Sequence, residues 1–417
     1  MTDEFPKIRN LEAFPYSEGG HSLVMLRDPS HMAERILVVT REVYSVLPLF
    51  NGRNSLLDIQ AELTRKQGEI VFRERIADLL HQLDKAHFLD NENFREHRKA
   101  VIERYHLRKT RPAFHANVSY PEEDTALLEQ INDMYVGEDG AGLPGPVTDR
   151  RIRALVAPHI DLRMGGQVYT HAYRALAESD PPDLFVIIGT CHSGLPCLFS
   201  LSGKDFETPL GISRLDQEFY EALRREFASS QYDEDLAHRS EHTIEFQLLF
   251  LQHLYRTTEV KILPVLASFS YEEFASPERK KLFWDFIETL KATEQLSGKR
   301  VCYIASVDLA HMGPRYGDSF QPDRSFIDDT SKKDLEMLEY VTSNDPQGFF
   351  EYLSRERDRR RICGFPAIYT ILNLIGETEG RLLRHSHCTM DDTGSFVTYA
   401  SLAFYDRDRG TSKDPKI

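Results

Sequence analysis

Four histidines and one cysteine each stand in a short sequence context that is typical of a chemical site. Three of the histidines follow apolar, β-branched runs that predict buried parallel strands. Ligands bind just beyond the carboxyl ends of strands in open α/β sheets, so we expect these distant residues to meet in one pocket. Imidazole and thiolate suit iron, copper or zinc better than magnesium or calcium. The five residues are His159 in VAPHIDLRMGG, His192 in VIIGTCHSG, His242 in SEHTIEFQL, His311 in IASVDLAHMG and Cys363 in RRICGFPA.

Two of the histidines carry a second signal. His242 stands in the first turn of a predicted helix over 242–255, with Ser240 as its predicted N-cap. The helix dipole there favours a neutral imidazole, which can serve as a base or as a hydrogen-bond donor. Asp308, three residues before His311, predicts a carboxylate that orients the His311 ring or raises its basicity. The alternative is an aspartate that caps the loop. The sequence contains no H-E-x-x-H motif, so it does not support a zincin metalloprotease.

Cys363 begins a predicted helix over 364–375 and follows a run of arginines. A helix N-terminus and nearby cations both stabilise a thiolate, which is the form that binds metal or attacks as a nucleophile. The alternative is a buried structural cysteine. Cys191 is expected to pack instead of binding a ligand, because it and His192 point in opposite directions on an extended chain. The arginines are Arg355, Arg357, Arg359, Arg360 and Arg361.

Composition narrows the class of protein. A chain of 417 residues predicts roughly two or three domains. A formal net charge of −15 argues against a nucleic-acid partner. No run approaches the roughly 18 apolar residues of a membrane helix, and the first ten residues, MTDEFPKIRN, do not resemble a secretory signal. Five cysteines without a C-x-x-C pair predict reduced thiols in a cytoplasmic protein.

From residue 151 onward, apolar strands alternate with amphipathic helices. This pattern predicts an α/β fold with a mostly parallel or mixed sheet that is flanked by helices on both faces. The predicted strands are RALVAPH, LFVIIGTCH, VKILPVLAS, RVCYIASVDLAH, RLLRHSH and SFVTYASLAFY. The predicted helices are 166–178, 214–228, 242–255, 274–292, 327–342 and 364–375.

Residues 34–90 predict a small separate block with one strand at 36–40, three short helices and a closing ribbon, as in a winged-helix module. The segment VLPLFNGRNSLLDIQAEL resembles the PqqD-like family. That resemblance implies recognition of an extended leader peptide, which adds a strand to a sheet edge. The alternative is a docking or structural module without a peptide ligand. The basic run from Arg95 to Arg111 predicts a solvated helical face.

The larger part of the chain resembles the Memo family, also known as protein B of the AmmeMemoRadiSam system. The resemblance runs from about Arg111 to Tyr405 and rests on FETPLGISRLDQEF, AHRSEHTIEFQLLFLQ, SVDLAHMG and the Cys-Gly pair before an apolar helix. It implies a fold similar to the class III extradiol dioxygenases, which are non-heme iron enzymes. It also implies metal binding by His159, His192 and Cys363, with His242 and His311 in the same pocket. The expected organisation is therefore a PqqD-like module over 1–94, a basic linker helix over 95–110, a Memo-like domain over 111–408 and a tail over 409–417.

The chain departs from the family pattern in three places. It reads PHIDL where relatives read PHAGY, which introduces Asp161, and ANVSYP where relatives read AGSFYP. No counterpart of the dioxygenase glutamate ligand is evident, and Cys363 takes its place. Thiolate is softer and more oxidisable than carboxylate, so dioxygenase activity does not follow from the fold.

These observations predict a metalloprotein with two histidine ligands and one cysteine ligand that carries out redox or oxygen-dependent chemistry on a small molecule or peptide. Iron(II) is the first expectation, followed by copper and zinc, and His242, His311 and Asp308 are the expected catalytic groups. One alternative is an accessory protein that presents a peptide to a radical-SAM partner and does no chemistry itself. Another is a metal-free enzyme with Cys363 as nucleophile and His311 or His242 as its base.

Overall fold

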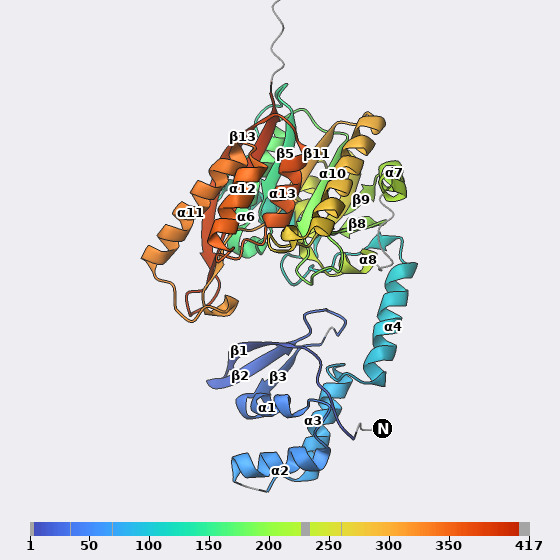
Figure 1. The fold of residues 1–417 in the computed structure, drawn as a ribbon, viewed down its shortest axis with the longest axis vertical. Helices are drawn as coiled ribbons and strands as arrows, with labels where there is room; N and C mark the ends of the chain where they lie inside the picture. Colours follow the sequence, from blue (N-terminus) through green and yellow to red (C-terminus); the bar gives the residue numbers. More distant parts are fainter. Residues whose placement is uncertain (1–3, 34, 69, 227–233, 260, 408–417) are drawn as a thin grey trace, which may run out of the picture. The chain divides into compact units, whose positions relative to one another are not determined.

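The chain forms two compact units, Met1–Arg108 and Lys109–Ile417, in a computed structural model (Figure 1). The structure describes residues 4–33, 35–68, 70–226, 234–259 and 261–407. The predicted tail over 409–417 lies outside the described residues. Among the described residues, no helix is both long enough and apolar enough to cross a membrane. All five cysteines are free thiols, as their spacing predicts.

The first unit places a small antiparallel sheet before a set of helices. The predicted strand at 36–40 is confirmed as β3, which pairs with β2, and β2 pairs with β1. Strands β1 and β2 were not predicted. Helix α1 ends at Val46, and a separate 3-10 turn with Pro48 as its second residue follows at Leu47. The elements are β1 (Glu12–Glu18), β2 (His21–Arg27), β3 (Leu37–Thr40), α1 (Arg41–Val46), η1 (Leu47–Leu49), α2 (Leu56–Gln67), α3 (Arg73–Lys85) and α4 (Glu92–Leu107).

The helices of this unit begin and end where their local chemistry allows. Ser55 and Asp58 form a reciprocal capping box at the start of α2, and Gly68 ends that helix in the left-handed conformation. The apolar faces of the helices in this unit pack with the sheet around Phe50, Ile59 and Leu83. The predicted linker helix is α4, and it belongs to this unit.

The second unit is built on an eleven-stranded mixed sheet, in agreement with the predicted α/β class. Its centre is parallel in the order β5-β11-β6-β10, and antiparallel β14 extends it next to β5. The full path is β12-β14-β5-β11-β6-β10-β9-β8-β4, with β13 beside β14 and β7 beside β10. The strands are β4 (Thr110–Arg111), β5 (Ile152–Ala157), β6 (Leu184–Thr190), β7 (Phe199–Leu201), β8 (Asp205–Thr208), β9 (Gly211–Leu215), β10 (Lys261–Ala267), β11 (Val301–Ser306), β12 (His311–Met312), β13 (Thr378–Thr389) and β14 (Phe396–Asp406).

Helices cover both faces of this sheet. Successive strand residues point to opposite faces, so Val186 and Ile188 pack with α7 and α10–α13, whereas Phe185 and Ile187 pack with α5, α6 and α9. The helices are α5 (Asp124–Val136), α6 (Leu162–Ala177), α7 (Gln217–Glu226), α8 (Glu234–Ala237), α9 (His242–Leu254), α10 (Pro277–Ser297), α11 (Arg324–Thr342), α12 (Pro346–Glu356) and α13 (Phe365–Leu374), with 3-10 turns η2 (Glu273–Ala275) and η3 (Pro314–Tyr316).

Two differences from the predicted elements bear on the site. Helix α6 begins at Leu162, four residues earlier than predicted, because the carboxylate of Asp161 caps it and accepts a hydrogen bond from the backbone N–H of Arg163. The residue by which the chain departs from the PHAGY pattern is therefore a helix cap. The predicted helix over 214–228 begins at Gln217, because the residues before it form strand β9. Helices α5 and α12 and the strands β7–β9 were not predicted.

Candidate metal centre

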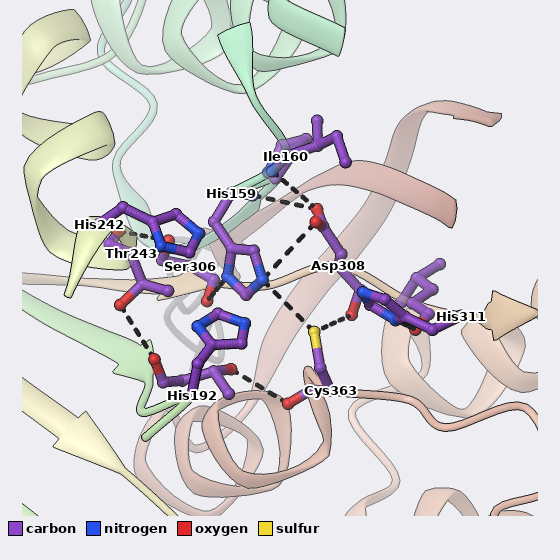
Figure 2. A network of polar contacts seen from close by, with 12 residues as sticks. His159, Ile160, His192, His242, Thr243, Ser306, Asp308, His311 and Cys363 are labelled. Carbon is purple, nitrogen blue, oxygen red and sulfur yellow. Dashed lines mark hydrogen bonds and ion pairs between the residues drawn. The ribbon is translucent and has the colours of Figure 1, made fainter. Parts of the chain in front are cut away.

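The predicted site residues gather where three parallel strands end. His159 follows β5, His192 follows β6 and Asp308 follows β11, and these strands are neighbours in the sheet. His242 begins α9, and Cys363 lies just before α13. Figure 2 shows their side chains directed toward one another. The topology thus brings together residues up to 204 positions apart in the sequence.

Three imidazoles form the core of this cluster. One ring nitrogen from each of His159, His192 and His242 lies within 4.8 Å of the others. The rings of His192 and His242 stack with centroids 4.9 Å apart, and the His159 ring meets both edge-on. His159 is buried, whereas the side chains of His192 and His242 are 42% and 28% exposed. The cluster therefore opens to solvent on the side of His192 and His242.

Hydrogen bonds fix the orientation of each ring. The Nδ1–H of His159 donates to the carbonyl of Ser306 at 3.0 Å. Nδ1 of His192 and Nδ1 of His242 each lie 3.1 Å from Oε1 of Glu241. When a ring bound in this way is neutral, its proton lies on Nδ1 and the lone pair of Nε2 is available, which is the arrangement of histidine ligands in metal sites. The residues present therefore fit a transition-metal ion.

Glu241 orients two of the three imidazoles and caps α9. Its carboxylate also accepts hydrogen bonds from the backbone N–H groups of His192 at 2.8 Å and His242 at 2.9 Å. The expected N-cap, Ser240, is wrong, because the longer glutamate side chain reaches back to these groups. Burial raises the pKa of Glu241, but the charge and hydrogen bond of His192 and the hydrogen bond of His242 outweigh it and hold the pKa well below its usual value.

Cys363 approaches the cluster from the side of His159. Its Sγ lies 3.4 Å from Nε2 of His159 and 3.4 Å from the carbonyl oxygen of Asp308. Gly364 makes this approach feasible, because a Cβ at that position would lie 2.6 Å from Cβ of Val307 and 2.7 Å from the Asp308 carbonyl oxygen. The thiol is thus within reach of a metal held by His159.

The expectation that Cys363 is a thiolate is wrong for the metal-free chain. Burial, followed by the charge of Asp308, raises the pKa of the thiol well above its usual value. The neighbouring arginines do not oppose this rise, because Arg360 pairs with Asp334 and Arg361 pairs with Asp318. A metal ion would therefore displace the thiol proton on binding.

Asp308 acts on His159 and not on His311. Its Oδ1 accepts the backbone N–H groups of His159 and Ile160, each at 3.1 Å, and its Oδ2 lies 3.6 Å from Nε2 of His159. Burial raises the pKa of this carboxyl to about 7, although the two backbone hydrogen bonds lower it. A carboxyl with this pKa can hold or release a proton near neutral pH.

His311 lies on the other side of Asp308 and Cys363 from His192 and His242 (Figure 2). Its Nδ1–H donates to the carbonyl of Leu309 at 3.0 Å, and its ring meets Tyr316 edge-on. Burial lowers the pKa of His311 to about 4, although its hydrogen bonds to the backbone of Leu309 and Arg361 raise it, so the ring is neutral near pH 7. His311 is near the cluster without belonging to the three-imidazole group.

A buried ion pair supports the start of α9, which carries Glu241 and His242. Arg111 is fully buried and pairs with the carboxylate of Glu245. Its guanidinium also donates to the carbonyls of His238 at 3.0 Å and Glu241 at 2.8 Å. The prediction that Arg111 belongs to a solvated basic face is wrong, because its partners come from a segment 130 residues away.

Comparisons with known proteins agree with the resemblance to the Memo family. Part of the prediction of this site rested on that resemblance. A family model described as Memo-like protein matches residues 111–403. A MEMO1 family protein of Aquifex aeolicus is 29% identical over 405 residues, which is 96% of this chain and 100% of the relative, so the similarity includes both units. A MEMO1 family protein of Methanopyrus kandleri is 32% identical over 297 residues, which is 68% of this chain and 95% of the relative. A crystal structure of an uncharacterized Escherichia coli K12 protein covers 61% of this chain and 99% of its own, with 13% identity and a TM-score of 0.33, too slight a similarity to bear on the site.

Proposed function

The chain belongs to the Memo family, and from this membership together with the geometry of the site we propose that it is a metal-binding protein. The proposed ligands are His159, His192 and His242, with Cys363 as a further ligand. The observation that carries the proposal is the set of three ring nitrogens within 4.8 Å of one another, on rings whose Nδ1 atoms are already bound. This assignment adds His242 to the predicted set of His159, His192 and Cys363.

Iron(II) is the first proposed metal, by resemblance to the non-heme iron dioxygenases, and copper and zinc follow. Imidazole and thiolate donors suit all three ions. A redox-active ion would supply electron transfer or oxygen-dependent chemistry at this place. The activity proposed is accordingly redox or oxygen-dependent chemistry on a small molecule or a peptide.

The side chains around the ring cluster have distinct proposed roles. A substrate would approach past His192 and His242, because these side chains are exposed while His159 is buried. Asp308, with its pKa of about 7, is suited to hold or release a proton beside His159. His311, whose ring is neutral and is held by the backbone of Leu309 and Arg361, is proposed to orient a substrate group or to exchange a proton with it.

Replacing Cys363 with alanine tests whether the thiol is a ligand. We expect Cys363→Ala to contain less metal than the wild type after anaerobic purification, while the three imidazoles retain part of it. Elemental analysis measures the content, and Cys302→Ala, which removes a fully buried thiol from β11, is the matched control. Equal metal content in Cys363→Ala and the wild type would exclude Cys363 as a ligand, and absence of metal in the wild type would refute the proposed metal centre.

The same thiol separates the metal proposal from a metal-free enzyme with Cys363 as nucleophile. A thiolate that is held by a metal ion is shielded from a thiol-directed reagent, whereas an unbound nucleophilic thiolate reacts at once. A thiol-directed reagent should therefore label Cys363 poorly in the metal-loaded protein. Rapid labelling of this residue in the loaded protein, unchanged by a chelator, would favour the nucleophile instead.

A second candidate function is peptide recognition by the first unit, with presentation to a radical-SAM partner. The observation that favours it is an open sheet edge: among the described residues β3 pairs only with β2, and its Val38 is 44% exposed. A peptide that added a strand there would bind by main-chain hydrogen bonds and side-chain pockets. The PqqD-like resemblance of the following segment points to the same mode.

We expect Val38→Lys to weaken peptide binding by the full chain at least tenfold, because a solvated cation would replace an apolar contact on the edge strand. Ile70→Lys is the control, since Ile70 is 75% exposed outside the sheet. Fluorescence anisotropy with labelled peptides, made from the leader segments of precursor genes beside the gene of this protein, measures the affinity. Binding that is absent in the wild type, or equally strong in Val38→Lys, would contradict this function.

A further inference from the structure

A single buried amide joins the strand ends that carry the metal-binding residues. Gln247 lies on α9 and is fully buried. Its Nε2 donates to the carbonyl of Pro158 at 2.7 Å and to the hydroxyl of Ser306 at 2.7 Å, and its Oε1 accepts from the hydroxyl of Tyr173 at 2.7 Å. The amide is therefore held from three sides, and its orientation is fixed by its partners.

The two acceptors of this amide control both the backbone and the ring of His159. Pro158 is the residue directly before His159, at the end of β5. Ser306 ends β11, and its carbonyl accepts the Nδ1–H of the His159 ring. Gln247 thus ties together the two strand ends that decide where Nε2 of His159 points.

The same network continues to the other two imidazoles. The hydroxyl of Ser306 donates to the carbonyl of Thr243, the residue after His242, at 2.5 Å. The hydroxyl of Thr243 donates to the carbonyl of Thr190, two residues before His192, at 3.1 Å. Figure 2 shows Thr243 and Ser306 close to the three rings. Every strand or helix end that supplies a ring is linked through this chain of hydrogen bonds.

We propose that Gln247 is a positioning residue, which sets the mutual geometry of His159, His192 and His242 through Pro158, Ser306 and Thr243. This inference rests on the proposed metal centre and names the residue that organises it. Outer partners of histidine ligands typically account for about 10–100-fold of metal affinity. Glu241 contacts two of the imidazole rings directly. Gln247 acts through intermediate residues, but these residues belong to or hold all three segments that carry the rings.

The chain provides a matched control on the same helix. Gln252 is also buried on α9, and its Nε2 donates to the hydroxyl of Ser213 at 2.9 Å while its Oε1 accepts from Thr208. Its partners Thr208 and Ser213 lie in β8 and β9, and within the described part of the chain no hydrogen bond joins them to the imidazoles. Gln247→Met and Gln252→Met therefore remove the same kind of buried amide from the same helix, with the loss of three hydrogen bonds at Gln247 and two at Gln252.

The test is titration of the metal-free full-length variants with Co²⁺, followed by its ligand-field spectrum and by competition with a chelator. We expect Gln247→Met to lower Co²⁺ affinity about tenfold or more and to shift the ligand-field bands. Gln252→Met should lose similar thermal stability and keep the affinity and spectrum of the wild type. Wild-type affinity and bands in Gln247→Met would overturn the positioning role, whereas a wild type that binds no Co²⁺ would overturn the metal centre itself.

A second pair of variants, which remove a smaller group, tests the proposal if Gln247→Met does not fold. Ser306→Ala removes one acceptor of Gln247 and the link to Thr243, but retains the Ser306 carbonyl that binds His159. Ser213→Ala removes the corresponding acceptor of Gln252, and both serines are fully buried. A weaker Co²⁺ complex in Ser306→Ala alone supports the proposal, and equal affinity in both variants overturns it.

Discussion

Glu241→Gln is expected to weaken metal binding by about 100-fold, at the upper end of the range for outer partners of histidine ligands. Among the described residues, the carboxylate of Glu241 has donors as its hydrogen-bond partners: the Nδ1 atoms of His192 and His242 and the backbone N–H groups of His192, His242 and Thr243. A glutamine amide would turn its NH₂ group toward at least one of these donors. That ring would rotate or take the other tautomer, and its Nε2 would then carry a hydrogen instead of a free lone pair.

This prediction can be separated from a general loss of stability. Glu123→Gln is the matched control, because Glu123 is also a glutamate N-cap, at α5, and its carboxylate accepts from the backbone N–H of Ala126. Anaerobic competition with a chromophoric chelator gives the metal affinity, and thermal unfolding gives the stability. If Glu241→Gln bound metal as tightly as Glu123→Gln, Glu241 would be a helix cap with no part in the metal centre.

The position of the site was predictable from sequence because it depends on a general property of parallel sheets. Apolar, β-branched runs before His159 and His192 mark buried strands, and the carboxyl ends of neighbouring strands meet at one edge. The runs do not reveal the strand order, so the role of Glu241 could not be derived: its partner His192 is 49 residues away. The one local signal was a carboxylate directly before His242 at a helix start.

Charge was the least reliable guide in this sequence. The arginines before Cys363 predict a thiolate, but Arg360 turns to Asp334 on α11 and Arg361 turns to Asp318. Arg111 is the last residue of a basic run in the sequence, but its side chain is fully buried in the fold. A long side chain reaches several ångströms from its backbone, so neighbours in sequence say little about which charge it meets.

Arg111→Met is expected to lower the free energy of unfolding by about 3–5 kcal/mol, the cost of leaving a buried charge without its partner. Glu245 would keep its hydrogen bonds from the backbone N–H groups of Phe114 and His115 and from the hydroxyl of Tyr120. None of these donors carries a positive charge. Urea unfolding at pH 7 measures the change. Arg214→Met, which breaks an exposed pair with Asp205, should cost at most about 1 kcal/mol.

The pH dependence of this difference identifies its cause. Burial raises the pKa of Glu245, but the charges of Arg111 and His115 and the hydrogen bonds from Tyr120 and Arg111 together outweigh it, so the pKa in the folded chain lies below the usual value of 4.5. A depressed carboxyl pKa stabilises the folded state above the unfolded pKa, and this stability is lost as the pH falls through the folded pKa. The gap between the wild type and Arg111→Met should therefore be widest near neutral pH and narrow below about pH 4. A gap that stays constant down to that pH would mean that Arg111 stabilises the chain by packing and by its hydrogen bonds to carbonyls, and not by neutralising Glu245.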